Sequence, residues 1–301
     1  MSKQIQWFPG HMKSALEMIK AELKLCDIII YMLDARCPKS CLNPKYEEFL
    51  SRKPVLFIAN KADLAPPHKE YLSLNSTLSG AGKKVTEAIG HILCDKITAA
   101  CNKGIRFTAR AIVIGVTNCG KSTFINNLAA KGKTKTGDRP GVTRSKQWVP
   151  VNDYLWLLDT PGTLWPKFDN PQVAKNLAYV GSIKDDIIDI VAVAKDLLSD
   201  LMRLDPNCLN DRFGIMVNAN TMFVQETMNP IGLPYLGTRV RGLPNTLPQM
   251  EELAELAFEQ ICRRRGYILK GGVLDEERAA KAILTEFRAG KLGRFNLDDL
   301  L

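Results

Sequence analysis

Residues 115–122 have the types and the spacing of a loop that wraps phosphate groups. The segment Gly115-Val116-Thr117-Asn118-Cys119-Gly120-Lys121-Ser122 fits the pattern G-x-x-x-x-G-K-S. The glycines let backbone N–H groups close around phosphates, Lys121 brings catalytic positive charge to the β and γ phosphates, and Ser122 offers an oxygen to Mg²⁺. The segment predicts a nucleoside triphosphate site with these contacts: Asn118, Cys119, Gly120, Lys121, Ser122 and Thr123.

A second motif, Asp159-Thr160-Pro161-Gly162, begins 37 residues after Ser122 and follows the apolar run 156–158. At this spacing we expect Asp159 to hold the metal ion through water and the Gly162 N–H to meet the γ phosphate. Between the two motifs, Thr143 is the candidate to complete the Mg²⁺ shell while the γ phosphate is present, and so to act in catalysis. Thr134 and Thr136 are the alternatives.

The base is predicted by Asn60-Lys61-Ala62-Asp63, which follows the apolar run 55–59. The Asp63 carboxylate can accept both the N1–H and the exocyclic amine of guanine, whereas adenine offers no matching donors. Asn60 is expected to tie the loop together, and the stem of Lys61 to pack on the base. Downstream, Asn75 and Ser76 could contribute backbone contacts to the guanine oxygen, although an ordinary Ser/Thr turn would have the same sequence.

The order of these motifs is unusual. In ordinary GTPases the base-specificity motif follows the phosphate and metal motifs, whereas here it comes first, at residue 60. A compact domain tolerates moved termini, so the site can survive such a circular permutation. The chain then runs from the γ-phosphate contact at Gly162 directly into the rest of the molecule, which would place a nucleotide-dependent switch next to a second domain.

The elements that must position these residues alternate along the chain. Short apolar runs predict strands over 27–33, 55–59, 109–114 and 156–158, and helical spacing appears over 12–25, 86–100 and 123–130. Alternating strands and helices predict an α/β fold with a mostly parallel sheet, here of the P-loop class. Residues 66–84 are expected to form a loop with a short element near residues 71–75.

Beyond about residue 175 the pattern becomes helical. Helices are predicted over 186–202, 251–262 and 275–289, with Gly266 as a C-cap after the second and mostly connections over 204–248. We therefore expect a permuted GTPase domain over 1–178 and a smaller, mainly helical domain over 179–301.

The net charge of +9 is concentrated. Residues 101–150 contain ten basic side chains and one acid, so this window alone accounts for the excess. A basic segment indicates a phosphate-rich partner, and a solvated charged loop is the alternative. Within the window, residues 131–146 are almost free of apolar side chains, which predicts a mobile loop.

The remaining composition is ordinary for a globular protein. The eight cysteines show no framework spacing, so free thiols are expected, and Cys37 and Cys41 lack the second pair that a zinc site would need. No apolar run is long enough to span a bilayer and no leader sequence or lipidation box is visible, so a cytoplasmic protein without a membrane partner is expected.

Taken together, the motifs resemble those of the YlqF/RbgA family of circularly permuted ribosome biogenesis GTPases. Besides the nucleotide motifs, the likeness includes Trp7-Phe8-Pro9-Gly10-His11-Met12, Asp34-Ala35-Arg36, residues 137–143 and Trp165-Pro166-Lys167. It is close from residue 7 to about 185 and weaker toward the C-terminus, and residues 214–248 look like an insertion. The resemblance implies GTP hydrolysis stimulated by the large ribosomal subunit, a role late in its assembly, and a helical C-terminal domain that contacts RNA.

The resemblance also gives roles to single residues. Ribosomal RNA as the partner would account for Lys131, Lys133 and Lys135, which contacts to the nucleotide phosphates do not explain. Position 163, where many small GTPases have a water-orienting Gln, is Thr163, so His11 becomes the family candidate for that task, with a structural role near the first helix as the alternative.

Asn118 matches the P-loop Asn of GTPases that use a potassium ion, with a loop-stabilising amide as the alternative. The expected cofactors are thus Mg²⁺ and, as a candidate, K⁺; the ligands are GTP and GDP, and a monomer is expected. A signalling GTPase at membranes and a scaffold that binds GTP without hydrolysis are the rival functions. The missing lipidation box argues against the first, and the complete phosphate and metal motifs argue against the second.

Overall fold

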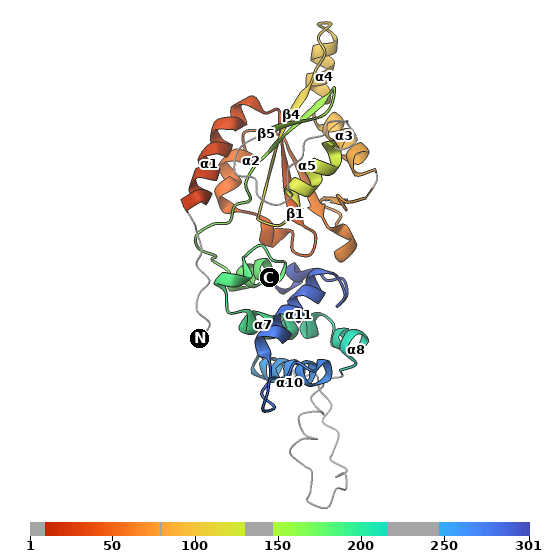
Figure 1. Cartoon of the computed structure of the whole chain (residues 1–301). Helices are drawn as coiled ribbons and strands as arrows, with labels where there is room; N and C mark the ends of the chain where they lie inside the picture. The colour runs from red at the N-terminus through yellow and green to blue at the C-terminus, as the bar shows by residue number, and fades with distance from the viewer. Residues whose placement is uncertain (1–9, 79, 130–146, 216–246) are drawn as a thin grey trace, which may run out of the picture. The chain divides into compact units, whose positions relative to one another are not determined.

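The computed structural model describes residues 10–78, 80–129, 147–215 and 247–301 (Figure 1), and the side chains among them except those of residues 10–13, 147 and 247–249. The chain divides into two compact units. The first contains Met1–Ile183 together with Asn296–Asp299 and Leu301, and the second contains Lys184–Phe295 with Leu300. The sequence predicts a boundary after residue 178 and assigns the whole C-terminal end to the second domain. The structure instead returns Asn296–Asp299 to the first unit.

The first unit contains a six-stranded sheet in the order β3-β2-β1-β4-β6-β5. Five strands run parallel: β1 (Ile28–Asp34), β2 (Val55–Asn60), β3 (Leu72–Leu74), β4 (Ala109–Gly115) and β6 (Leu155–Asp159). The edge strand β5 (Gln147–Asn152) pairs antiparallel with β6. Every residue of β1 is buried, as expected for a central parallel strand with both faces covered. The predicted α/β fold with a mostly parallel sheet is confirmed.

Helices connect the parallel strands of this sheet, as crossovers require. The first unit contains α1 (Gly10–Glu22), α2 (Glu47–Leu50), α3 (Ala81–Ile92), α4 (Cys94–Cys101), α5 (Lys121–Ala129) and α6 (Pro171–Tyr179). Helix α3 packs on β2 and α5 packs on β4, β5 and β6, whereas α4 buries none of its side chains and extends beyond the sheet (Figure 1). The sequence predicts one helix over 86–100, and this is wrong in detail. The backbone leaves the helical region at Leu93 (φ −101°, ψ +15°), whose side chain is buried, so two helices form instead of one.

The second unit is helical in its described residues. It contains η6 (Asp185–Ile187), α7 (Ile190–Leu204), α8 (Cys208–Phe213), α10 (Leu247–Arg265) and α11 (Glu276–Arg288). The apolar face of α7 packs against α10 and α11. Gly266 ends α10 with a φ of +68°, as its predicted capping role requires. Helix α8 lies in a stretch predicted as connections, and residues 216–246 of that stretch lie outside the described part of the chain.

Two partly buried ion pairs link elements of the second unit. The Arg212 guanidinium donates to both carboxylate oxygens of Glu286, at 2.8 and 2.6 Å, and so joins α8 to α11. The Arg288 guanidinium forms the same fork with Asp185, with both distances at 2.7 Å.

No described helix has the length and apolar character that crossing a membrane would require.

Candidate nucleotide-binding site

The three sequence motifs meet at one edge of the sheet. The phosphate-binding loop follows β4, Asp159 ends β6, and Asn60 ends β2. These strands are parallel, so their carboxyl ends point the same way, and this edge is where open α/β sheets bind ligands. The order of the motifs along the chain does not matter to the site, because strand adjacency alone places them together.

Lys121 lies folded over the phosphate-binding loop. Its Nζ donates to the carbonyl oxygens of Val116 (2.7 Å) and Gly115 (3.2 Å), and the residue is only 6% exposed. Gly162 approaches the same loop closely, because a Cβ built on it would lie 2.7 Å from Thr117 Cα and 2.8 Å from Lys121 Nζ. Only glycine fits here, so the backbone after β6 can reach the place where the lysine charge is held.

The predicted metal ligands are also adjacent. The Ser122 hydroxyl donates to Asp159 Oδ2 at 3.1 Å. A hydroxyl and a carboxylate are the hard oxygen donors that Mg²⁺ prefers, so the donor set fits that ion. Next to it, the Thr160 hydroxyl donates to the Val113 carbonyl at 2.6 Å and fixes the end of β6 against β4.

Asn60 ties three segments together. Its Nδ2 donates to the Cys119 carbonyl at 2.9 Å, and its Oδ1 accepts from the Ser76 N–H at 3.0 Å. Gly120 makes room for this amide: its φ is +98°, and an added Cβ would lie 2.4 Å from Asn60 Nδ2. The Asn75 Oδ1 accepts from the Thr77 N–H at 3.0 Å, so Asn75 and Ser76 form a polar turn beside the base motif.

Lys61 adopts a left-handed backbone conformation (φ +59°) and reaches across to the phosphate-binding loop. Its Nζ donates to the Asn118 carbonyl at 2.8 Å and to Asp34 Oδ2 at 2.9 Å. Asp63 lies in the short turn η4 (Ala62–Leu64) with its side chain exposed. The carboxylate is therefore free to meet a base that rests on the lysine stem.

Asp34 and Arg36 form a buried ion pair that the sequence did not assign to the site. The Arg36 Nε and Nη2 donate to the two Asp34 carboxylate oxygens at 2.8 and 2.7 Å, and both side chains are at most 2% exposed. Burial alone would raise the pKa of the Asp34 carboxyl, but the charges of Arg36 and Lys61 outweigh it and hold that pKa well below its ordinary value. The clue available in the sequence was an acid at the end of an apolar run, and the structure places that acid in register with Asn60.

Thr163, at the position where a water-orienting Gln would stand, is fully buried. Its hydroxyl is hydrogen-bonded to the Tyr46 hydroxyl and accepts from Asn43 Nδ2 at 3.4 Å, while its N–H donates to the Gly115 carbonyl at 3.3 Å. The side chain is thus turned into the core. Its hydroxyl cannot orient an attacking water in this arrangement.

Asn118 has a positive φ (+57°), and its Nδ2 donates to the Gly181 carbonyl at 2.6 Å. Next to it, the Thr117 hydroxyl donates to the Ser182 carbonyl, and the Ser182 hydroxyl donates back to the Thr117 carbonyl at 2.9 Å. The loop-stabilising role of Asn118 and its candidacy as a potassium ligand are both compatible with this bond, because the bond uses the amide nitrogen and not the amide oxygen that would bind an ion.

Some predicted residues lie outside what the structure describes. Thr143, the alternatives Thr134 and Thr136, and the basic residues Lys131, Lys133 and Lys135 belong to residues 130–146. His11 lies in the first turn of α1, but its side chain is not among those described. All eight cysteines are free thiols, and within the described residues no group of three or more His, Cys, Asp or Glu side chains could hold a metal ion.

The fold and the site define a P-loop GTPase whose base-recognition motif precedes its phosphate motifs. A family model described as "50S ribosome-binding GTPase" matches residues 110–217, which include both phosphate motifs and exclude Asn60-Lys61-Ala62-Asp63. The chain is 36% identical over 308 residues to "Ribosome biogenesis GTPase A" of Bacillus cereus, covering 98% of this chain and 93% of that protein. The protein of the same name from Bacillus pumilus is 37% identical over 303 residues, covering 96% of each chain.

This chain belongs to the ribosome biogenesis GTPase A family, and the YlqF/RbgA resemblance is confirmed. Among solved structures, GNP-bound YlqF from T. maritima has the same fold, with a TM-score of 0.54, 23% identity and coverage of 93% of this chain and 96% of that one. The protein is therefore a GTP-hydrolysing enzyme of ribosome biogenesis, and its circular permutation is shared with that structure.

Proposed function

We propose that this GTPase binds the large ribosomal subunit through ribosomal RNA late in assembly, and that the particle stimulates its hydrolysis of GTP. The burial of Thr163 carries the proposal. With that hydroxyl bonded to Tyr46 and Asn43, the loop after Gly162 offers no polar side chain at position 163 to orient the attacking water. Hydrolysis by the isolated protein should then be slow, on the order of the 10⁻⁴ s⁻¹ of unassisted Ras-like enzymes.

The proposal includes the nucleotide contacts, and the geometry of the described residues supports them. Backbone N–H groups of residues 118–123 and Gly162 would surround the phosphates, and Lys121 would transfer its hydrogen bonds from the loop carbonyls to the phosphate oxygens. Ser122 and Asp159, with Thr143, would hold Mg²⁺, which neutralises charge on the phosphates when bound. Asp63 would select guanine, while Asn60 and Lys61 hold the loop and Asn75 and Ser76 line the base.

His11 is the proposed source of water positioning, supplied by the first turn of α1. Asn118 is the proposed potassium ligand. Lys131, Lys133 and Lys135, with the helical second unit, are the proposed RNA contacts. The proteins named "Ribosome biogenesis GTPase A", together with the printed description of the matching family model, support the ribosomal partner. The concentrated positive charge of residues 101–150 supports RNA as the surface that is recognised.

Two measurements test the proposal. Co-sedimentation with large ribosomal subunits should be stronger with a non-hydrolysable GTP analogue than with GDP. Added subunits should raise the hydrolysis rate of the wild type at saturating GTP. The variant Ser122→Ala, which lacks the metal-binding hydroxyl, should show no stimulated hydrolysis and serves as the control for contaminating activity. Equal sedimentation in both nucleotide states and an unchanged rate would reject the proposal.

A further inference from the structure

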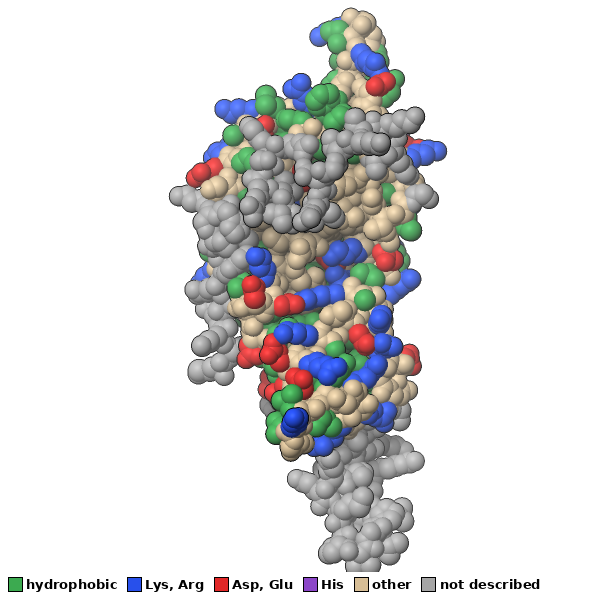
Figure 2. All heavy atoms as spheres, viewed as in Figure 1, with side chains coloured by type: hydrophobic (Ala, Val, Ile, Leu, Met, Phe, Trp, Pro, Cys, Tyr) green, Lys and Arg blue, Asp and Glu red, His purple; other side chains and the backbone are tan. Residues whose placement is uncertain are grey.

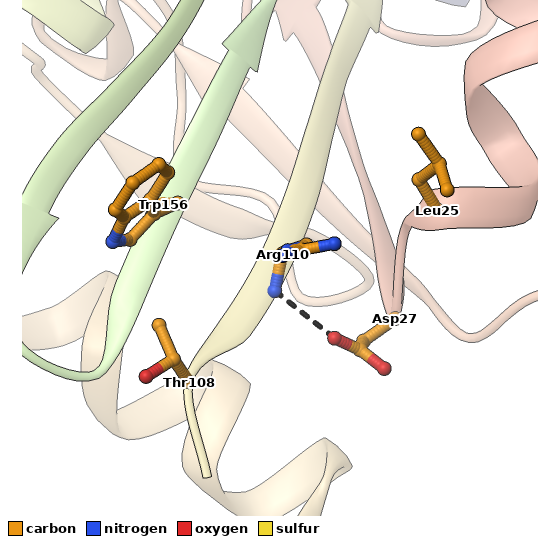
Figure 3. A pocket seen from close by; sticks show the side chains of 5 residues that line it. All are labelled: Leu25, Asp27, Thr108, Arg110 and Trp156. Atoms are coloured by element: carbon orange, nitrogen blue, oxygen red, sulfur yellow. Dashed lines mark hydrogen bonds between the residues drawn. The ribbon is translucent and has the colours of Figure 1, made fainter.

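An open groove lies at the amino ends of β1, β4 and β6, at the other end of the sheet from the phosphate-binding loop. Its volume is about 440 Å³, and Leu25, Asp27, Thr108, Arg110 and Trp156 line it (Figure 3). Arg110 and Gly115 are five residue steps apart along β4, which corresponds to roughly 16 Å. A ligand in this groove would therefore leave the nucleotide edge accessible.

An indole and a guanidinium, from two neighbouring strands, both line the groove. Arg110 and Trp156 are paired residues of β4 and β6, so their side chains leave the same face of the sheet (Figure 3). The neighbours of Arg110 in the strand, Ala109 and Ala111, point to the opposite, buried side. Trp156 is 40% exposed, which leaves part of the indole available for stacking.

The charge of the groove favours an anionic ligand. The Asp27 carboxylate is already engaged, because it accepts from Lys96 Nζ at 3.1 Å and from the Arg110 backbone N–H at 3.1 Å. In the described part of the chain no carboxylate forms an ion pair with the Arg110 guanidinium.

The β5–β6 turn next to Trp156 also combines an aromatic ring with a cation. Tyr154 is 60% exposed and carries the Arg106 guanidinium 5.0 Å from its ring centroid, and Arg106 also pairs with Asp153 at 2.7 Å. Near α4, at the same end of the first unit, Figure 2 shows hydrophobic and basic side chains next to one another. Lys96, Arg106 and Arg110 thus outnumber Asp27 and Asp153 around the exposed rings of Tyr154 and Trp156.

We propose that this groove binds a single-stranded segment of RNA, with a base stacked on Trp156 and the neighbouring phosphate on Arg110. Alternating aromatic and cationic side chains are the means by which proteins hold unpaired bases, whose flat faces and backbone charge need both. An apolar peptide would use the indole but would desolvate the cations without compensation. The inference rests on the proposed ribosomal RNA partner and adds a contact surface apart from residues 131–146.

The test compares three variants with a matched control. Binding of a fluorescein-labelled 12-nucleotide single-stranded RNA is measured by anisotropy in the presence of GDP, together with co-sedimentation with large subunits. Trp156→Ala should weaken oligonucleotide binding by roughly 5- to 150-fold, the range for loss of one stacked base, and Trp156→Phe should retain most of it. Arg110→Glu should also flatten the slope of log affinity against log salt by about 0.7 or more.

Lys83→Glu is the control, since it makes the same change of net charge on an 81% exposed side chain of α3. All four variants should keep wild-type GDP affinity, which verifies folding. The assignment of the groove to RNA would be rejected if Trp156→Ala and Arg110→Glu bound the oligonucleotide as the wild type does, or if Lys83→Glu lost as much affinity as they do. If these variants lost subunit binding but kept oligonucleotide binding, the groove would be assigned to a protein partner, and the RNA proposal would be rejected. If the wild type binds the oligonucleotide through these residues but no subunit, the proposed function fails while the groove stands.

Discussion

Replacing Asp34 with Asn tests whether the buried Asp34–Arg36 pair holds the guanine-binding loop. The change keeps the size of the side chain and removes its charge. Because Arg36 is 2% exposed, its guanidinium would lose a buried counter-charge, and removal of one partner from such a pair costs about 3–5 kcal/mol of folding free energy. Lys61 would lose one of its two Nζ contacts and keep the Asn118 carbonyl.

The effect on the nucleotide should be smaller than the effect on folding. A hydrogen bond to a charged group contributes about 1.5–3 kcal/mol, and the Lys61 side chain is 28% exposed, which reduces that figure. We therefore expect the affinity for GDP to fall by about three- to tenfold, or roughly 1 kcal/mol. Urea denaturation gives the folding free energy, and titration of a fluorescent GDP analogue gives the affinity.

The pH dependence supplies a second check. The folded-state pKa of Asp34 is depressed, so its contribution to stability is present above the ordinary carboxyl pKa and is lost as pH falls toward the folded value. The difference in stability between wild type and Asp34→Asn should thus narrow as the pH is lowered below about 4. Asp153→Asn, which breaks the exposed pair with Arg106, is the control and should leave the denaturation midpoint unchanged.

A double-mutant cycle decides how Asp34 acts on the nucleotide. In a Lys61→Ala background, Asp34→Asn should no longer change GDP affinity, because the Lys61 side chain through which Asp34 acts on the base is already absent. An equal loss of affinity in both backgrounds would refute the positioning of Lys61 by Asp34. Unchanged stability in the single variant would refute the assigned importance of the buried pair.

The remaining predictions concern the phosphate, base and water sites. Gly162→Ala should lower GTP affinity by more than tenfold, because its Cβ would meet the phosphate-binding loop, whereas Gly90→Ala, with nothing within 4 Å, should bind GTP normally; equal affinities would contradict this. Asp63→Asn should shift preference from guanine to xanthine nucleotides in a competition assay, and retained guanine preference would remove Asp63 from base recognition. His11→Ala should lower the subunit-stimulated rate while GTP affinity is kept; loss of nucleotide binding would instead support its structural role. Replacing potassium with sodium should slow turnover, and equal rates would exclude Asn118 as an ion ligand.

Much of the first unit could be predicted because its strands are short, apolar and followed directly by motif residues. Strands β1, β2, β4 and β6 fall within one or two residues of the runs 27–33, 55–59, 109–114 and 156–158. The edge strand β5 was missed, since Gln147–Asn152 contains a proline and only a partial apolar alternation, as edge strands often do. Its pairing with β6 is a tertiary contact, which no local sequence pattern indicates.

The candidate site was found where chemistry is local and missed where it depends on pairing. Backbone loops for phosphate, such as residues 115–122, have a fixed spacing in sequence, so they can be recognised without a structure. Asp34 and Thr163 differ, because their roles depend on partners brought together by the fold. Asp34 meets Lys61 across the strand register, and Thr163 meets Asn43 and Tyr46 at the 3₁₀ helix η3 (Pro44–Tyr46). Sequence spacing cannot show whether a threonine faces a ligand or the core.

The return of Asn296–Asp299 to the first unit changes how this protein can be divided. The Leu297 N–H donates to the Arg36 carbonyl at 2.7 Å, and Asp298 accepts from the Lys39 N–H and from the Ser40 hydroxyl, each at 2.6 Å. In chain order the helical unit is therefore inserted between two parts of the first unit. A fragment that ends near residue 183 would lack Asp298, so buried Ser40 would lose these hydrogen bonds. An isolated GTPase domain should therefore include residues 296–301, joined to residue 183 by a short linker.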